Sequence, residues 1–386
     1  LKPGERSGRT EDGWWPVEPA PDPFSDDALL DLARLNEDVA GQSGFVRREG
    51  ASLVLGNGEP VRFWGVNCGP GIVRLDDGSL RYLARRLAKV GVNAVRIHGA
   101  VFDRVAKDPA AVDAVYLERL HFFVAALKNE GIYTTLSFHF PLWFPIRPGY
   151  GIEGYEGMRD AKPFGLLFFE PRMQEIHRAW ARALLTTTNP HTGVPLGKDP
   201  AVAAVEIQNE DSLLFWTFRP METIPPAQTK VLEERFGSWL AKRHGSLEEA
   251  LRGFPSAGHA RDDIEAGRAG LLPAYDLTGR GHGEGDRRRR ASEQLRFLVE
   301  LQRDYYAETV RVLRDDLGSK SLVICGNWHT ADPAVLDALE RYTYTAGDIL
   351  DQHGYFGGRH EGQGSSYSVR VGHTYADRAA VLEPGA

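Results

Sequence analysis

The chain has 386 residues, of which 42% are hydrophobic and 26% charged, and a formal net charge of −7 at pH 7. This composition is typical of a globular protein, and the length suits one large barrel or two ordinary domains. The acidic balance gives no reason to expect nucleic acid or an anionic membrane as a partner, and no apolar run approaches the roughly 18 residues of a membrane-spanning helix.

The first segment of the chain differs in composition from the rest. Residues 1–43 are rich in proline and acidic residues, and we predict an irregular extension that contains a short helix over residues 26–39. The main domain is expected to span residues 44–386. We expect a secreted or periplasmic protein, although no apolar signal segment opens the chain at Leu1.

The main domain opens with two apolar runs, at residues 45–55 and 60–66. Asn57 and Gly58 lie between them, and an Asn-Gly pair in this position favours a tight β-hairpin turn. The second run leads directly into the first strand that we predict for the main sheet.

A unit of helix, glycine and apolar strand then occurs twice in succession. In the first unit, a helix that we expect Ser79 to cap ends at Gly91, before a strand over residues 92–98. In the second unit, a helix ends at Gly131, before a strand over residues 132–138. Two consecutive copies of this pattern indicate parallel β/α units.

A third helix, over residues 172–185, precedes a short apolar run at residues 201–207 that has the length and composition of a buried parallel strand. Residues 211–290 are too many for a simple loop, so we predict an insertion after this fourth strand. The arginine run at residues 287–290 is expected to be a solvated helix start rather than a site for an acidic ligand.

Two further strands are predicted at residues 321–325 and 348–350. The total is six, whereas a closed (β/α)₈ barrel needs eight. We therefore predict an α/β protein whose main domain is an incomplete TIM barrel with six of its eight units. Cys68 and Cys325 fall near the first and fifth strands, and two cysteines do not make a disulfide framework, so we expect free thiols.

Polar side chains follow the fourth predicted strand directly, as Asn209 and Glu210. In parallel sheets and barrels, catalytic groups gather at the carboxyl ends of the strands. The stretch resembles strand four of the retaining glycoside hydrolases of clan A, such as the family 5 cellulases and mannanases. This resemblance implies that Glu210 is the general acid/base and that Asn209 binds the 2-hydroxyl of the sugar.

The same resemblance assigns roles at other predicted strand ends. Arg96 matches an arginine that orients the nucleophile, and His139 matches a substrate-binding histidine. Tyr355 matches a tyrosine that hydrogen-bonds the nucleophile, and two tryptophans are suited to stacking on sugar rings. The expected substrate-binding residues are Asn209, Arg96, His139, Trp143, Trp328, His353 and Tyr355.

The nucleophile of this clan is a glutamate at the end of strand seven, and the sequence offers no clear match. Glu383 follows a short apolar run that meets a proline, and Glu361 lies among glycines, so both are weak candidates. We expect the nucleophile to lie beyond Ala386, in which case this polypeptide alone has little or no activity. We expect a carbohydrate substrate and, because two carboxyl groups perform this chemistry, neither a cofactor nor a metal.

Two other functions fit part of the pattern. His98, His139, His329 and His353 lie near predicted strand ends, as ligands of a metal-dependent barrel hydrolase would. The first strand lacks the His-x-His pair that such amidohydrolases carry. A barrel that binds carbohydrate without cleaving it is the second alternative.

Overall fold

The computed structural model describes residues 21–158, 161–354, 357–361 and 374–378. The chain divides into two units. One is Leu30–Gln352, and the other combines Leu1–Leu29 with His353–Ala386. The first of these holds the helices and the parallel sheet.

The second unit contains an antiparallel strand pair, β9 (Gly357–Glu361) and β10 (Thr374–Arg378), in which Gly357 lies opposite Arg378. Our sequence analysis found no convincing strand pattern in this region. The reason is that both strands are largely polar, with two glycines in β9, and they lack the apolar alternation by which a strand is recognised.

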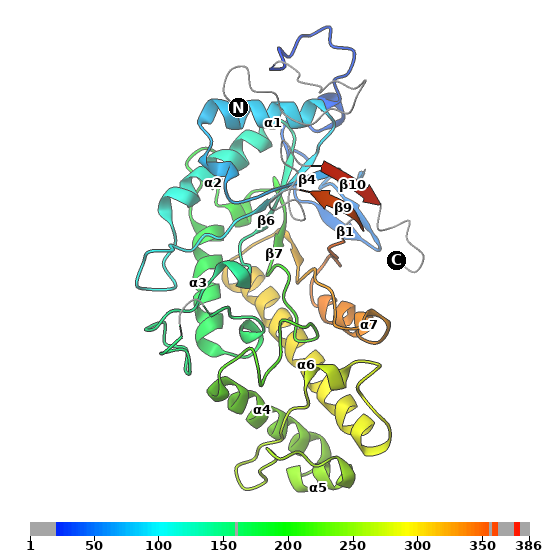
Figure 1. Ribbon diagram of the computed structural model, residues 1–386. Coiled ribbons are helices and arrows are strands. Elements are labelled where there is room, and N and C mark those ends of the chain that lie inside the picture. Colours follow the sequence, from blue (N-terminus) through cyan, green and yellow to red (C-terminus); the bar gives the residue numbers. More distant parts are fainter. Residues whose placement is uncertain (1–20, 159–160, 355–356, 362–373, 379–386) are drawn as a thin grey trace. The chain divides into compact units, whose positions relative to one another are not determined.

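The centre of the larger unit is a parallel sheet with the strand order β4-β5-β6-β7-β8 (Figure 1). The protein is therefore of the α/β class, and the strands predicted at these places are confirmed. The sixth predicted strand is reduced to a single parallel bridge between Ile324 and Ile349. The strands are β4 (Gly65–Cys68), β5 (Ala94–His98), β6 (Tyr133–Ser137), β7 (Val202–Glu206) and β8 (Leu322–Ile324).

A small antiparallel sheet precedes the parallel one. It consists of β1 (Arg47–Glu49), β2 (Ser52–Val54) and β3 (Pro60–Val61). The predicted hairpin is confirmed between β2 and β3, and Gly58 in its turn has a φ of 91°, which a glycine adopts without strain.

Three helices connect successive strands of the parallel sheet: α1 (Asp77–Lys89), α2 (Ala114–Lys128) and α3 (Pro171–Thr186). They lie on the same side of the sheet (Figure 1). The cap of α1 is Asp76 rather than the expected Ser79, whose backbone N–H donates to the Asp76 carboxylate at 2.9 Å. An aspartate three residues earlier satisfies the free N–H groups of the first turn equally well.

The helix predicted over residues 26–39 is wrong. The structure has only a 3₁₀ turn there, Ala33–Leu35. The side chain of Asn36 instead donates to the carbonyl oxygens of Val92 and Glu130, at 3.0 and 3.4 Å. Tertiary contacts thus override the local helical preference of this segment.

One face of the parallel sheet packs against the helices. Val95 and Ile97 of β5 are buried in a core that includes Leu120 and Phe123 of α2 and Trp180 of α3. Because successive residues of a strand point to opposite faces, the residues between them face the other side of the sheet.

The opposite face of the sheet is apolar near the amino ends of the strands and polar near their carboxyl ends. Near its amino end, Tyr133, Ala204 and Leu322 are buried together, and Leu53 and Val61 of the hairpin pack against them. The hairpin therefore covers the amino end of this face. The carboxyl end of the same face is left to polar side chains.

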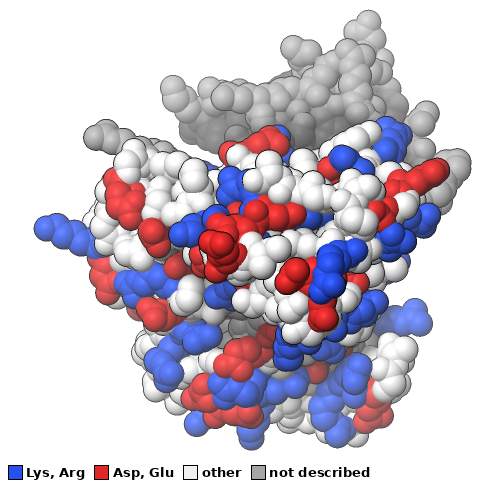
Figure 2. Space-filling model, turned by 90° about the horizontal axis from the view of Figure 1, so that it is seen from below, with Lys and Arg blue, Asp and Glu red and all other residues white. Residues whose placement is uncertain are grey.

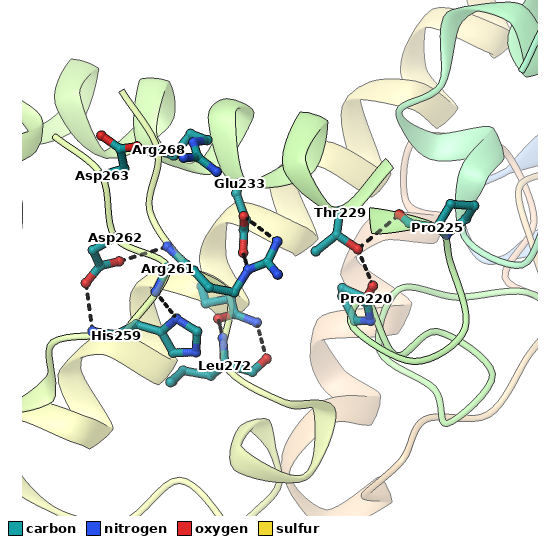
Figure 3. A network of polar contacts seen from close by, with 12 residues as sticks. Pro220, Pro225, Thr229, Glu233, His259, Arg261, Asp262, Asp263, Arg268 and Leu272 are labelled. Carbon is teal, nitrogen blue, oxygen red and sulfur yellow. Dashed lines mark hydrogen bonds and ion pairs between the residues drawn. The ribbon is translucent and has the colours of Figure 1, made fainter. Parts of the chain in front are cut away.

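The predicted insertion follows β7 and is built on α4 (Pro226–His244), α5 (Leu247–Arg252) and the first turns of α6 (Gly285–Arg311). Figure 3 shows Glu233 of α4 and Arg261 pointing toward one another, with 2.6 Å between Nε and Oε1. Figure 2 shows acidic and basic residues interspersed over one face of the molecule, without a continuous patch of one sign.

The arginine run at the start of α6 is only partly solvated, which corrects our expectation. Arg290 is completely buried, and its Nη1 and Nη2 donate to the carboxylate of Asp262 at 2.8 and 2.5 Å. Arg287 is half-exposed and pairs with Asp276 at 2.7 Å. Helical periodicity turns one member of the run inward, onto the face that Phe297 also occupies two turns later.

The remaining helical elements complete the larger unit. α6 runs into a π-helical segment, Val312–Asp316, and α7 (Pro333–Tyr344) follows β8. None of the helices in the described ranges is long and apolar enough to cross a bilayer. Cys68 and Cys325 are both free, as predicted. Six more 3₁₀ turns are Ile72–Arg74, Pro141–Trp143, Leu166–Phe168, Leu196–Lys198, Pro255–Ala257 and Ala274–Leu277.

Candidate active site

A polar network occupies the carboxyl end of the open face of the sheet, and Arg96 is its centre. Its guanidinium holds Glu206 through two bonds, with Nε to Oε2 at 2.9 Å and Nη2 to Oε1 at 2.7 Å. It also donates to Asn67 Oδ1 at 2.9 Å, to Ser137 Oγ at 3.0 Å and to Asn209 Oδ1 at 2.8 Å. One side chain thus fixes groups from β4, β6 and β7 and from the residues that follow β7.

The strand register explains why these side chains meet. Asn67 lies opposite Arg96, and Ser137 lies opposite Glu206. All of them point to the face that the helices do not cover. The Glu206 side chain is fully buried, and a buried carboxylate requires a charge partner, which Arg96 supplies.

The bonds of Ser137 determine the tautomer of His98. The single hydroxyl hydrogen of Ser137 is donated to Glu206 Oε1 at 2.5 Å. His98 Nδ1 lies 2.8 Å from the same Oγ, so Nδ1 carries the hydrogen of this contact. The ring of His98 also lies 4.2 Å from that of Trp143, between centroids. Trp143 therefore lies beside the polar network.

Asn209 and Glu210 follow β7 in a constrained turn. The Oδ1 atom of Asn209 accepts from Arg96 and from Asn327 Nδ2, the latter at 3.4 Å. The backbone N–H of Glu210 donates to Asn327 Oδ1 at 2.9 Å. Glu210 has a φ of 48°, a left-handed conformation that costs a non-glycine residue about 1–2 kcal/mol. Its side chain is partly exposed.

Trp328 lies at the next strand end, after β8. Its backbone N–H donates to the hydroxyl of Tyr344 at 2.9 Å, and its ring contacts that of Phe215 at 5.3 Å. A cavity of about 80 Å³ lies beside it, lined also by Glu340 and Asp351. The structure thus brings Trp328, the second predicted stacking residue, to the edge of the sheet where Asn327 contacts Glu210.

His139 is placed elsewhere. Its ring is fully buried against His177 and Trp180 of α3, at centroid distances of 5.4 and 5.6 Å. Among the described residues neither ring nitrogen has a hydrogen-bond partner. Burial, reinforced by His177, holds the pKa of His139 well below its ordinary value. We therefore leave His139 out of the site that we propose.

The predicted metal-hydrolase arrangement also depends on these histidines. His98 contacts Ser137 and Trp143, whereas His139 contacts the helix residues behind the sheet. The ring of His98 thus lies beside the polar network, and the ring of His139 lies against α3.

Four predicted or considered residues fall in the other unit of the chain. His353 is described and partly buried there. Tyr355 and Glu383 lie outside the described residues, and Glu361 ends β9, of which only the backbone is described. The roles expected of these residues remain predictions.

The sequence analysis missed Glu206 and Asn327 as members of the network. Glu206 lies within an apolar run and reads there as part of the strand. The usable signal was a carboxylate inside one predicted strand and an arginine, Arg96, inside another, because two buried opposite charges require each other. Asn327 follows the predicted strand over residues 321–325 closely, but it was given no role.

Two buried carboxyl groups lie directly behind the Glu210 turn. Asp211 accepts the backbone N–H groups of Gly165 and Ser212, at 2.9 and 3.0 Å. Glu340 of α7 accepts from the Ser212 hydroxyl at 2.6 Å. Burial raises the pKa of each of the two carboxyl groups to about 7.

Comparisons with known proteins give no sequence family. No family model and no curated protein matches the chain. Among solved structures, an endo-1,4-β-mannanase from Rhizomucor miehei is similar at a TM-score of 0.38 and 14% identity, over 78% of this chain and 87% of that one. An endo-β-1,4-mannanase from Thermotoga petrophila gives 0.35 and 15%, over 82% and 73%.

A β-galactosidase from Halorubrum lacusprofundi gives a TM-score of 0.44 and 15% identity, over 76% of this chain and 40% of that one. These three solved structures are glycoside hydrolases. Because these TM-scores are below 0.5, we base the proposals below on the contacts of the chain itself.

Proposed function

We propose that this protein is a glycoside hydrolase that cleaves β-glycosidic bonds of oligo- or polysaccharides with retention of configuration, with Glu210 as the general acid/base. The observation that carries the proposal is the turn after β7. There a strained, partly exposed glutamate follows an asparagine whose amide Arg96 and Asn327 hold in one orientation. Backbone strain of this kind is concentrated at functional sites.

Each residue of the turn suits a step of glycoside cleavage. Glu210 in its protonated form would give a proton to the departing glycosidic oxygen and would later take one from the attacking water. Two donors on Oδ1 of Asn209 turn its Nδ2 away from Arg96, so Nδ2 is the end that would donate to a sugar hydroxyl. Trp143 and Trp328 would supply apolar surfaces for sugar rings.

The retaining mechanism also needs a nucleophilic carboxylate. Glu206 is unsuited to this role because it is fully buried and both of its oxygens accept hydrogen bonds from Arg96. A 2-deoxy-2-fluoro glycoside with a good leaving group would trap the true nucleophile as a covalent adduct. Peptide mapping of that adduct would identify the residue.

Activity on a panel of 4-nitrophenyl β-glycosides tests the proposal, with glucoside, mannoside and galactoside as the first members. Glu210→Gln should reduce kcat/KM for the cleaved substrate by about 10²–10⁴-fold and leave the unfolding temperature nearly unchanged. Glu308→Gln, an exposed change of the same kind on α6, is the matched control. Azide should restore turnover of Glu210→Ala and yield a β-glycosyl azide.

An unchanged rate in Glu210→Gln would refute the assignment. A full-length protein that binds oligosaccharide but cleaves no member of the panel would instead support the carbohydrate-binding alternative.

A further inference from the structure

Glu340 lies on α7, 130 residues from Glu210 in sequence. Its side chain is 2% exposed. Oε2 accepts from the Ser212 hydroxyl at 2.6 Å, and Oε1 accepts from Gln302 Nε2 at 2.8 Å. The hydroxyl of Tyr344 is a third hydrogen-bond partner. Because this buried carboxyl group accepts several hydrogen bonds, an apolar side chain could not replace it.

Each of these partners also holds a backbone group next to the proposed site. Ser212 Oγ accepts the N–H of Leu214 at 2.9 Å. Gln302 Oε1 accepts the N–H of Leu213 at 2.9 Å. These two bonds fix the chain immediately after Glu210, on the side of the turn away from β7.

The third partner reaches the other strand end. Tyr344 Oη accepts the N–H of Trp328 at 2.9 Å. The residue before Trp328 is Asn327, whose side chain accepts the N–H of Glu210. The turn after β7 and the segment after β8 are therefore connected both directly, through Asn327, and from behind, through Glu340.

We propose that Glu340 is a positioning residue that holds the Glu210 turn and the Trp328 segment in their relative places, through Ser212, Gln302 and Tyr344. This inference rests on the proposed function. It deepens it, because it names a buried helix residue on which the geometry of proton donation depends. A glutamate in a left-handed conformation needs such a frame, since the turn would otherwise relax to a less strained form.

The arrangement requires an acceptor at both oxygens of residue 340. All three partners can donate to a carboxylate, and two of them, Ser212 and Tyr344, already accept a backbone N–H on the same oxygen atom. In Glu340→Gln one carboxylate oxygen becomes an NH₂ group, which has to face one of these donors. The variant keeps the size of the side chain and removes one link of the frame.

The test distinguishes impaired proton donation by Glu210 from a general loss of structure. Glycosides with poor leaving groups, such as alkyl glycosides or oligosaccharides, need the proton that Glu210 supplies, whereas 2,4-dinitrophenyl glycosides leave without it. For Glu340→Gln in the full chain, kcat/KM on the former should fall about 10–100-fold and on the latter by less than about threefold. Glu308→Gln on the surface of α6 should change neither value.

Ser212→Ala is the second, milder variant, because it removes the same link from the other side. It should show the same dependence on the leaving group. Combined with Glu340→Gln, it should add little to the effect of the latter, because the two changes break one connection.

Equal losses on both substrate types, or additive effects of the two variants, would overturn the positioning role while leaving the glycosidase proposal intact. Failure of the full-length protein to cleave any glycoside would remove both proposals. If Glu340→Gln fails to fold, the leaving-group dependence of Ser212→Ala decides alone.

Discussion

Arg96 on β5 reaches across β6 and holds both carboxylate oxygens of Glu206 on β7. The glutamate side chain is fully buried and that of the arginine is 17% exposed. The pair crosses three strands of the sheet at the level where the proposed site begins. Because Arg96 also donates to Asn209, the same ion pair stabilises the sheet and helps to position the Asn209-Glu210 turn.

Removal of the arginine alone should be strongly destabilising. In Arg96→Met the buried carboxylate of Glu206 loses its guanidinium partner, so the free energy of unfolding should fall by about 3–5 kcal/mol in urea titrations. The double variant Arg96→Met/Glu206→Leu should recover a large part of this loss. Arg311→Met, which breaks an exposed pair, should change stability by less than about 1 kcal/mol. Equal stability of the single and double variants would contradict the interpretation.

Asn209→Asp tests the two ends of the asparagine side chain separately, because it keeps the acceptor oxygen and replaces the donor NH₂ group. The new carboxylate keeps an acceptor for Arg96 Nη2, so the unfolding temperature should not fall, but the donor proposed for the sugar hydroxyl is lost. We expect kcat/KM to fall about 10²-fold, which corresponds to about 2.7 kcal/mol of transition-state binding. The wild-type protein should discriminate against 2-deoxy glycosides and the variant should not. Retained discrimination in the variant would exclude this role.

The buried histidines behind the sheet should make the protein sensitive to acid. Burial lowers the pKa of His177 to about 4, whereas an unfolded histidine titrates near 6.5. Below about pH 6.5 the unfolded state therefore binds more protons than the native state, and stability falls with pH until about pH 4. Between pH 7 and pH 5 His177 alone should remove about 2 kcal/mol, and His139 acts in the same direction.

His177→Gln should flatten this dependence. Glutamine can still donate to the carbonyl oxygen of Ile207, which His177 Nε2 contacts at 2.9 Å. Urea unfolding at pH 7 and pH 5 measures the difference, with the surface variant His244→Gln as control. The same slope in His177→Gln as in the wild type would show that other groups cause the acid sensitivity.

The buried Arg290 should hold the insertion together through its planar shape as well as its charge. Besides two bonds to Asp262, it donates to the carbonyl oxygens of Ala257 and Gly270, at 3.1 and 2.7 Å. Arg290→Lys keeps the charge but not the fork, so amide hydrogen exchange over residues 257–272 should accelerate about 10²-fold while β5 to β7 stay protected. Arg287→Lys, at a half-exposed pair, is the control. Uniform acceleration across the sheet would contradict a local role.

The elements that could be predicted are those with strong local patterns. The glycines that end α1 and α2, Gly91 and Gly131, have φ values of 87° and 68°, so the sequence signal and the backbone geometry agree. The strands between helices were found because a short apolar run that follows a helix and ends in polar residues is typical of a buried parallel strand. Where the pattern is polar, as in β9 and β10, the same reasoning gave nothing.

The site was predictable only as far as strand alternation applies. Arg96 lies inside β5, so its direction follows from the pleat. His139 lies two residues after the end of β6, where the alternation no longer holds, and its ring turns to the helices. Glu340 gave no signal, because a polar residue in a helix is usually solvated and its partner Ser212 is 128 residues away.

The left-handed backbone conformation of Glu210 lowers the stability of the folded protein, whereas the proposed proton transfer requires a glutamate at this position. Glycine adopts a φ of 48° without steric penalty, so Glu210→Gly should be at least as resistant to heat as the wild type although it abolishes turnover. Selection for thermal stability alone would favour glycine over glutamate at this position. On the proposed function, the glutamate is retained in this conformation for proton transfer at the glycosidic bond.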